Sequence, residues 1–317
     1  MSQNLAKLLI IAGPTASGKT AISVEVAKKI HGEIIVADSM QVYRKLNIGT
    51  AKPSLEEMAG IPHHLIDIIC SDETFSAGAF AKEASKVIEA ATARGNVPII
   101  SGGTGLYIKA LIHGLAQGLP SDTAIKEDIK SRLVTDGLPK LYHELKSVDP
   151  KTAARLSPQD KQRVTRALEV YYAAGTPISE LQKKHKFKAE KYNYLFFALR
   201  RDRKELIERI EKRVDEMFEK GLVDETRMLI NRFKNKFEEK DISALRAIGY
   251  RETVLYLDGK LNLEETKALV KKSTRDYAKR QMTWLRHQHN VNWVDITENS
   301  EPQAEDFITS KALNFFT

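Results

Sequence analysis

An apolar run that ends in a glycine-bounded turn, close to the start of the chain, is the feature that most constrains the fold. Residues 8–20 read LLIIAGPTASGKT, so Gly13, Gly18, Lys19 and Thr20 fit the pattern G-x-x-x-x-G-K-[ST]. The run itself is typical of a buried parallel strand, and apolar residues recur at helical spacing after Thr20. Because a loop between a strand and a helix is the context that this pattern requires, we predict a phosphate-binding loop here.

The composition of this loop suits a diphosphate. Glycines let backbone N–H groups turn inward, and the N-terminus of the following helix adds partial positive charge. Lys19 supplies a point charge, and the Thr20 hydroxyl suits a Mg²⁺ ion that bridges phosphate oxygens. The alternative is a chance match in an ordinary strand–turn–helix. The candidate diphosphate- or nucleotide-binding residues are Gly13, Pro14, Thr15, Ala16, Ser17, Gly18, Lys19 and Thr20, with Thr20 as the candidate magnesium ligand.

Size and cysteine content narrow the class of protein. A chain of 317 residues can form one large or two modest domains. It has no apolar run near the ~20 residues that cross a bilayer and no signal-peptide pattern before Lys7, so we expect a cytoplasmic protein with no membrane partner. Because Cys70 is the only cysteine, neither an internal disulfide nor a cysteine-based structural zinc site can form.

Basic residues are concentrated in the second half of the chain. The formal net charge is +8, and the excess gathers after residue 180, notably at residues 200–204 and 275–286. This distribution favours a large polyanion as the partner over a small phosphate alone, although many basic proteins bind nothing in particular. Nucleic-acid binding is therefore one of two open interpretations at this point.

Further buried strands are predicted at residues 33–38, 65–69, 97–100, 194–199 and 291–296. Ligands of open parallel sheets bind beyond the carboxyl ends of the strands. Asp38 and Thr104 each follow a predicted strand, so both are expected beside the glycine loop. An aspartate at a strand end is equally often a turn or capping residue.

Residues 114–191 have helical periodicity and no strand signals, with helix starts at Ser121-Asp122 and Asp149-Pro150. A long amphipathic helix after residue 200 carries Arg209 and Arg213 four residues apart. The predicted fold class is α/β: a P-loop-type parallel sheet flanked by helices, with an inserted all-helical subdomain. The predicted core comprises residues 1–113 and 192–317, and the predicted insertion comprises residues 114–191.

Several motifs follow the glycine loop in a definite order, and the set resembles the bacterial tRNA dimethylallyltransferase family, also called the tRNA isopentenyltransferases. The resemblance covers almost the whole chain. The glycine loop alone is shared with many nucleotide-binding proteins, whereas the ordered set is specific. The motifs are Asp38-Ser39 with Tyr43, residues 48–53, Gly102-Gly103-Thr104 with Leu106-Tyr107, residues 166–170, Gly249-Tyr250-Arg251, residues 278–281 and residues 283–286.

The resemblance implies an activity and its partners. Members transfer a dimethylallyl group from dimethylallyl diphosphate to N6 of the adenine at position 37, beside the tRNA anticodon, and the donor and the adenine enter a channel from opposite sides. By position, Asp38 matches the family's general base, Arg213 its diphosphate-contacting arginine, and Thr104 a residue that contacts tRNA at the site. Mg²⁺ is the implied cofactor, the anticodon stem-loop the implied RNA partner, and a monomer the expected state.

Positional match also assigns the residues that contact tRNA. These are Asp38, Ser39, Met40, Gln41, Thr104, Lys126, Gln162, Arg163, Val164, Thr165, Arg166, Arg246, Ala247, Ile248, Gly249, Tyr250 and Arg251. Arg163 and Arg166 are three residues apart and share one helical face, which is usually only a solvated basic stripe. The resemblance favours the contact interpretation.

Two other functions fit the glycine loop. A small-molecule or nucleotide kinase would use it to hold ATP, but would leave the basic helical half of the chain unexplained. An RNA-binding protein with RNA-stimulated ATPase activity would hydrolyse ATP and leave the RNA covalently unchanged.

Overall fold

The computed structural model describes residues 5–114, 122–184, 191–233, 242–297 and 300–317. The chain forms two compact units, Met1–Ile112 with Lys191–Thr317 and His113–Glu190. These bounds lie beside those predicted for the core and the helical insertion. The chain leaves the core and re-enters it at one place, where the backbone N–H of Lys191 donates to the carbonyl oxygen of Ile112 at 3.1 Å.

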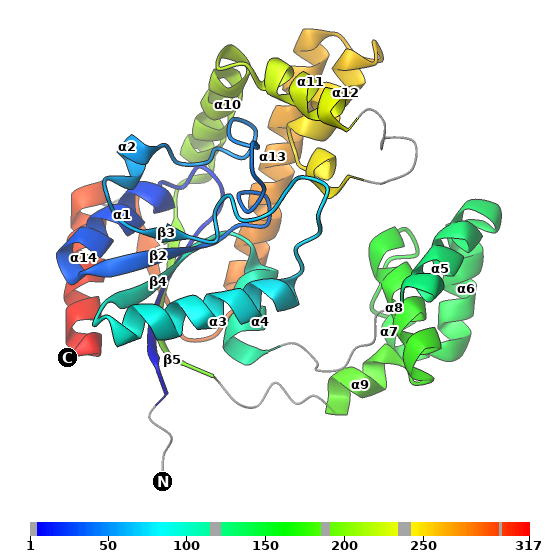
Figure 1. The fold of residues 1–317 in the computed structure, drawn as a ribbon, viewed down its shortest axis with the longest axis horizontal. Coiled ribbons are helices and arrows are strands. Elements are labelled where there is room, and N and C mark those ends of the chain that lie inside the picture. Colours follow the sequence, from blue (N-terminus) through cyan, green and yellow to red (C-terminus); the bar gives the residue numbers. More distant parts are fainter. Residues whose placement is uncertain (1–4, 115–121, 185–190, 234–241, 298–299) are drawn as a thin grey trace. The chain divides into compact units, whose positions relative to one another are not determined.

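A six-stranded parallel sheet forms the centre of the larger unit (Figure 1). Its spatial order is β3-β2-β4-β1-β5-β6. The strands are β1 Lys7–Ala12, β2 Gly32–Ala37, β3 His63–His64, β4 Val97–Gly102, β5 Asn193–Arg200 and β6 Val291–Asp295. The predicted α/β class with a parallel sheet is therefore confirmed.

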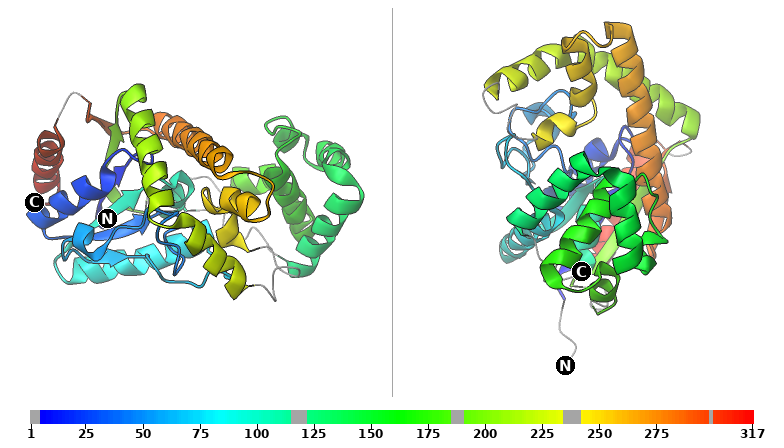
Figure 2. Two further views of the ribbon diagram at one scale, coloured as in Figure 1. Left: turned by 90° about the horizontal axis from the view of Figure 1, so that it is seen from above. Right: turned by 90° about the vertical axis from the view of Figure 1, so that its right-hand side faces the viewer.

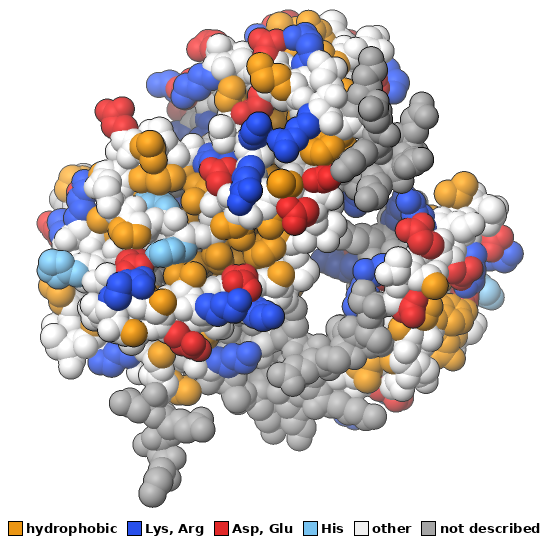
Figure 3. Space-filling model, viewed as in Figure 1, with side chains coloured by type: hydrophobic (Ala, Val, Ile, Leu, Met, Phe, Trp, Pro, Cys, Tyr) orange, Lys and Arg blue, Asp and Glu red, His pale blue; other side chains and the backbone are white. Residues whose placement is uncertain are grey.

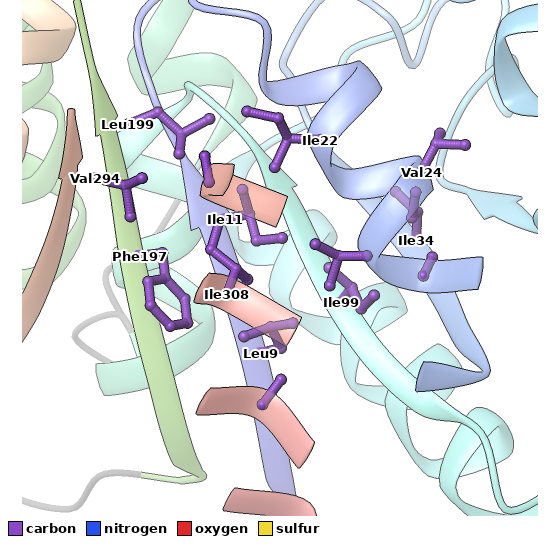
Figure 4. Packing of buried hydrophobic residues seen from close by; sticks show 14 of the residues in the cluster. Leu9, Ile11, Ile22, Val24, Ile34, Ile99, Phe197, Leu199, Val294 and Ile308 are labelled. Carbon is purple, nitrogen blue, oxygen red and sulfur yellow. The ribbon is translucent and has the colours of Figure 1, made fainter. Parts of the chain in front are cut away.

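Side chains that alternate along the strands fill the core on the two faces of the sheet. Leu9 and Ile11 of β1 pack with Ile22 of helix α1 (Lys19–Ile30) and with Ile308 of helix α14 (Glu301–Phe316), as Figure 4 shows. Helix α3 (Ala77–Ala93) contacts β2 and β4 from the other face (Figure 1). Because every strand runs the same way, the segments that follow β1, β2, β4 and β5 emerge at one edge of the sheet. We call this edge the carboxyl edge.

The strand predicted at residues 65–69 is wrong. The edge strand β3 contains only His63 and His64, because Leu65 (φ 62°) and Asp67 (φ 55°) adopt left-handed conformations that end the extended backbone. Ile68 and Ile69 instead donate their backbone N–H groups to the carbonyl oxygen of Val42. The apolar run therefore packs beneath a loop and does not extend the sheet.

Helices cover the carboxyl edge and the flanks of the larger unit. Helices α10 (Arg203–Glu219) and α13 (Leu263–Arg286) run side by side (Figure 2). The others are α2 Leu55–Met58, α4 Gly105–His113, α11 Leu222–Arg232, the short 3₁₀ helix η1 Ser243–Arg246, and α12 Tyr250–Leu257. No helix in the described part of the chain is long and apolar enough to cross a membrane.

The smaller unit is helical where it is described, as predicted. Its helices are α5 Thr123–Thr135, α6 Gly137–Val148, α7 Pro150–Ala153, α8 Lys161–Ala174 and α9 Ile178–Lys184. Asp122 and Asp149 cap α5 and α7 through side-chain oxygens that accept backbone N–H groups. Ser121, the other residue of the predicted helix start, lies outside the described residues. Leu141, Leu145 and Leu168 are fully buried in a core of this unit.

Glu33, near the start of β2, is a buried carboxylate with polar partners on both oxygens. Arg94 donates to Oε1 from Nε (3.0 Å) and to Oε2 from Nη2 (2.7 Å), Asn96 donates to Oε1, and His64 Nε2 lies 2.7 Å from Oε2. The hydrogen bonds from Arg94, followed by those from Asn96 and His64, hold the pKa of Glu33 at about 2. This network ties β2, β3 and the end of α3 together.

Replacing Glu33 with glutamine is expected to lower the free energy of unfolding by about 1–3 kcal/mol near neutral pH, because the charge-assisted bonds are lost. A carboxylate with a depressed pKa stabilises the fold above its unfolded pKa, near 4.5, and that contribution disappears as the pH falls toward 2. Urea unfolding of both proteins at a series of pH values measures this difference, which should shrink on acidification. Glu83→Gln, on the exposed side of α3, is the control. A pH-independent difference would contradict the assignment.

Candidate functional site

A cavity of ≈ 660 Å³ lies at the carboxyl edge of the sheet. Lys19 and Thr20 line it from the start of α1, Asp38 from the end of β2, and Arg213 from α10. These segments lie far apart in the sequence, and the parallel sheet brings them together. The expectation that Asp38 shares one space with the glycine loop agrees with this geometry.

The glycine loop has the backbone shape of a phosphate cradle. Ala16 (φ 63°) and Gly18 (φ 93°) are left-handed, and α1 begins directly after Gly18. The ammonium group of Lys19 donates to the carbonyl oxygen of Pro14 at 3.2 Å, so the lysine folds back over the loop. A cation and the N-terminus of a twelve-residue helix therefore point into the same space.

Asp38 has two roles in its local structure. Its Oδ1 accepts the backbone N–H groups of Met40 (2.8 Å) and Gln41 (3.3 Å), which makes it a turn residue. Its side chain also lines the cavity. Thr104, after β4, lies beside it and accepts the backbone N–H of Ser39 on Oγ1 at 3.1 Å. Both interpretations of an aspartate at a strand end therefore apply to Asp38.

Burial and neighbouring charge shape the electrostatics of the cavity. Burial, and then the Arg213 guanidinium, lower the pKa of Lys19 to about 8, while the charge of Asp38 acts in the opposite sense. Burial, and then Arg209, lower the pKa of Arg213. Burial, and then the negative charge of Asp38, raise the pKa of Tyr277 to about 12. Two buried cations whose pKa values are both lowered are typical of a site for a negatively charged ligand.

The lowered pKa of Lys19 predicts how the affinity for a diphosphate depends on pH. A bound diphosphate favours the ammonium form and raises this pKa, so binding takes up a proton above pH 8. The dissociation constant for an organic diphosphate should be level from about pH 7 to 8 and then rise by up to about tenfold per pH unit. Calorimetric titration at several pH values measures it. Lys19→Met should abolish this dependence, and a level profile in the unaltered protein would contradict it.

Some of the residues predicted to contact tRNA line the same cavity. They are Asp38, Ser39, Met40, Gln41, Arg246, Ala247, Ile248 and Arg251. Gly249 is buried beside them. Lys126, Gln162 and Arg163 are exposed on α5 and α8 of the smaller unit, where Thr165 and Arg166 are half-buried.

The side chains of Tyr250 and Val164, two of the residues predicted to contact tRNA, are packing groups in this structure. Both are 0% exposed. The Tyr250 hydroxyl donates to Glu225 and accepts the backbone N–H of Gly49, and a Cβ at Gly49 would lie 2.5 Å from the tyrosine ring. Val164 belongs to the core of the helical unit.

Gln281 on α13 is a site residue that sequence reasoning missed. Its Oε1 accepts the backbone N–H of Thr15 at 2.8 Å, and its Nε2 donates to the carbonyl oxygen of Gly103 at 3.0 Å. The side chain therefore joins the glycine loop to the segment that carries Thr104. In the sequence, Gln281 belongs to the basic motif at residues 278–281, but nothing in that motif indicates which loop its side chain contacts.

Part of the basic excess is paired within the protein, which weakens the argument from charge runs alone. Arg275 pairs with Glu211, Lys271 with Asp215, and Arg200 with Asp295. On the face shown in Figure 3, Lys and Arg side chains are interspersed with Asp and Glu. A run of positive charge in the sequence therefore does not by itself mark a nucleic-acid surface.

The fold and the cavity together define a class: an α/β protein in which a loop of the pattern G-x-x-x-x-G-K-[ST] and a carboxylate line one cavity at the carboxyl edge of a parallel sheet. Such a site can hold a diphosphate and can accept a proton next to it.

Comparison with known proteins then identifies the family. A family model described as IPP transferase matches residues 41–288. A tRNA dimethylallyltransferase of Geobacter sulfurreducens is 44% identical over 310 residues, which is 98% of this chain and 97% of that protein. One of Natranaerobius thermophilus is 41% identical over 99% of this chain and 94% of that protein. This chain therefore belongs to the IPP transferase family, and it is a prenyltransferase.

Solved structures agree with this assignment. The full-length tRNA isopentenylpyrophosphate transferase of Bacillus halodurans matches with a TM-score of 0.70 and 40% identity, over 96% of this chain and 95% of that one. A eukaryotic dimethylallyltransferase that acts on tRNA matches with a TM-score of 0.80 and 32% identity, over 96% of this chain and 80% of that one. The likeness extends over nearly the whole chain in both cases.

Proposed function

We propose that this prenyltransferase moves a dimethylallyl group from dimethylallyl diphosphate to N6 of adenine 37 in the anticodon loop of tRNA. One observation supports this most directly: Lys19, Thr20 and Arg213 line the same cavity as Asp38. A diphosphate leaving group needs fixed positive charge, and an adenine amine needs a proton acceptor. Family membership also favours prenyl transfer over the kinase and ATPase alternatives.

Asp38 is assigned as the general base. The exocyclic amine of adenine is a poor nucleophile, because its lone pair is delocalised into the ring. As the N6–C1 bond forms, the C1–O bond to the diphosphate breaks and the N6 proton passes to a carboxylate oxygen of Asp38, from which it is released to solvent. The turn bonds from Met40 and Gln41 both use Oδ1, so we assign the proton to Oδ2.

Lys19 and Arg213 are assigned to the leaving group. Negative charge grows on the departing diphosphate, and preorganised cations in a partly buried site stabilise it more in the transition state than in the ground state. Thr20 fits as a ligand of Mg²⁺, which commonly takes one or two protein oxygens together with substrate phosphate oxygens and water. When bound, the ion would neutralise part of the diphosphate charge.

The adenine must leave the base stack to reach this cavity, since enzymes that modify bases generally extrude the target nucleotide. We assign polar residues of the predicted tRNA set that are exposed, half-buried or cavity-lining to hold the loop, namely Ser39, Gln41, Lys126, Gln162, Arg163, Arg166, Arg246 and Arg251. Recognition of a single-stranded loop by shape and phosphate contacts suits these long polar side chains. We propose that the enzyme acts as a monomer in the cytoplasm.

Mass spectrometry of tRNA tests this function. Incubation of the full chain with tRNA, dimethylallyl diphosphate and Mg²⁺ should release free diphosphate, and nuclease digestion of the tRNA should then yield an equal amount of N6-isopentenyladenosine from position 37. Incubation with labelled ATP in place of the prenyl donor is the control for the kinase and ATPase alternatives. Label transfer, or ATP hydrolysis without prenylated tRNA, would reject the proposal.

A further inference from the structure

Two arginines hold the glycine loop by its carbonyl groups. Arg201, the first residue after β5, donates from Nε to the carbonyl oxygen of Ser17 at 3.0 Å. Arg209, on α10, donates from Nε to the carbonyl oxygen of Ala16, also at 3.0 Å. Two consecutive peptide groups of the loop are thus each fixed by a guanidinium.

Fixing a carbonyl group also fixes an N–H group. In a trans peptide the C=O and the N–H point in opposite directions, so a bound Ala16 carbonyl turns the Ser17 N–H away from Arg209. The Ser17 N–H reaches the carbonyl oxygen of Pro14 at 3.3 Å, and this same oxygen accepts from the Lys19 ammonium at 3.2 Å. The Ser17 N–H and the Lys19 ammonium therefore meet at one carbonyl oxygen, which ties the conformation of this peptide to the position of the lysine assigned to the diphosphate. By the same rule, the bound Ser17 carbonyl turns the Gly18 N–H away from Arg201.

The backbone of this loop needs such support. Ala16 is left-handed at φ 63°, although it carries a side chain, and that side chain is buried against Ile210 and Ala278. Residues in sparsely populated backbone regions persist where the surrounding structure holds them, and they cluster at ligand-binding sites. The bond from Arg209 to Ala16 supplies part of that support.

Arg201 is itself held from two sides. Its side chain is only 6% exposed; Nη2 donates to Oε1 of Glu301 at 2.7 Å, and Nη1 donates to Glu205. Glu301 is the first residue of α14, and its Oε1 lies 3.1 Å from where a Cβ at Gly18 would be. Arg213 lines the cavity, whereas Arg201 has carboxylate and carbonyl oxygens around its guanidinium. Arg201 can therefore act on a ligand only through the loop.

We propose that Arg201 is a positioning residue for the prenyl donor: together with Arg209 it holds the backbone of the glycine loop in the conformation that receives the diphosphate, and Glu301 keeps Arg201 in place. This inference rests on the proposed function, because it takes the ligand of the loop to be a diphosphate. It extends the donor site to residues near the far end of the chain.

Arg201→Gln in the full chain tests the proposal, with Arg200→Gln as the matched control. Arg200 is the preceding residue; its side chain is 51% exposed and pairs with Asp295. Arg201→Gln should weaken the binding of inorganic pyrophosphate, measured by calorimetry, by about ten- to a hundredfold and raise the KM for dimethylallyl diphosphate, with tRNA affinity unchanged. Arg200→Gln should leave all three values unchanged. Equal pyrophosphate affinities in the two variants would overturn the proposal.

Glu301 provides a second test that does not depend on Arg201→Gln being folded. Glu301→Ala removes the partner of Arg201, whereas Glu301→Gln keeps an oxygen that can accept its hydrogen bond. Pyrophosphate affinity should therefore fall in the order unaltered protein, Glu301→Gln, Glu301→Ala. If both variants bind pyrophosphate normally and only their thermal midpoints fall, Glu301 has a purely structural role and the proposal is wrong.

The two proposals can fail separately. If the unaltered chain binds pyrophosphate in an Arg201-dependent way but does not prenylate tRNA, the proposed function is wrong and the positioning role is supported. If the unaltered chain prenylates tRNA and Arg201→Gln behaves like Arg200→Gln, the function stands and the positioning role is overturned.

Discussion

Replacing Asp38 with asparagine is expected to lower the single-turnover rate of prenyl transfer by ~10²–10⁴, the usual effect of losing a general base. Asparagine keeps a carbonyl oxygen that can accept the N–H groups of Met40 and Gln41, so the turn after β2 should survive. The substitution removes the carboxylate, which is the proposed proton acceptor. Rapid-quench measurement with enzyme in excess over tRNA isolates this step from product release.

Asp295→Asn is the matched control for Asp38→Asn. Asp295 also ends a strand at the carboxyl edge, but it binds Arg200 and the backbone N–H of Thr297. Its replacement should leave the transfer rate near that of the unaltered protein. Affinity for tRNA should be nearly unchanged in both variants, because phosphate contacts supply most of it. A normal rate in Asp38→Asn would remove this carboxylate from the mechanism.

Replacing Lys19 with methionine is expected to lower the transfer rate at saturating donor by ~10²–10³, similar to the loss of one donor in an oxyanion hole. Affinity for the donor should fall as well. Methionine has a similar length and suits a buried position, so the fold should persist. Because burial already disfavours the ammonium of Lys19, the thermal midpoint should be unchanged or higher.

The thermal midpoint of Lys19→Met shows whether a slower transfer rate comes from the missing ammonium group or from a disturbed fold. Lys29→Met on the same helix is the control, since Lys29 is exposed and pairs with Asp306. It should change neither the rate nor donor affinity. A Lys19→Met enzyme that reaches the normal rate once donor is saturating would show that the lysine stabilises the ground state and the transition state equally.

The sheet, and the placement of Lys19 and Asp38 in one cavity, could be predicted from the sequence, because their signals are local. The strand before Gly13 and the strand before Asp38 are short apolar runs followed by turn residues, and the parallel-sheet rule then places Lys19 and Asp38 at one edge. The prediction of a strand at residues 65–69 was wrong, although the run is largely apolar. Backbone conformations at Leu65 and Asp67, which composition does not reveal, turned that run into a loop.

Contacts between distant residues could not be predicted. Gln281 meets Thr15 across 266 residues, and Glu301 meets Arg201 across 100. No periodicity links such pairs, and the pattern gave no prediction for α14 at all. Arg201 shows the same limit: within the basic run at residues 200–204 it looked like part of a surface for a polyanion. In the fold it is buried against the loop.

The bond between the amide of Lys191 and the carbonyl of Ile112 bears on how the molecule can assemble and evolve. Strand β5 pairs with β1 although the whole helical unit lies between them in the sequence. The inserted residues begin after Ile112 and end before Lys191, and these two residues are hydrogen-bonded to each other. The entropy of closing a loop grows slowly with its length, so a longer or shorter excursion costs the central pairing little. A change in the length of the helical unit therefore need not alter the cavity at the carboxyl edge, so the sequences of the two units can diverge at different rates.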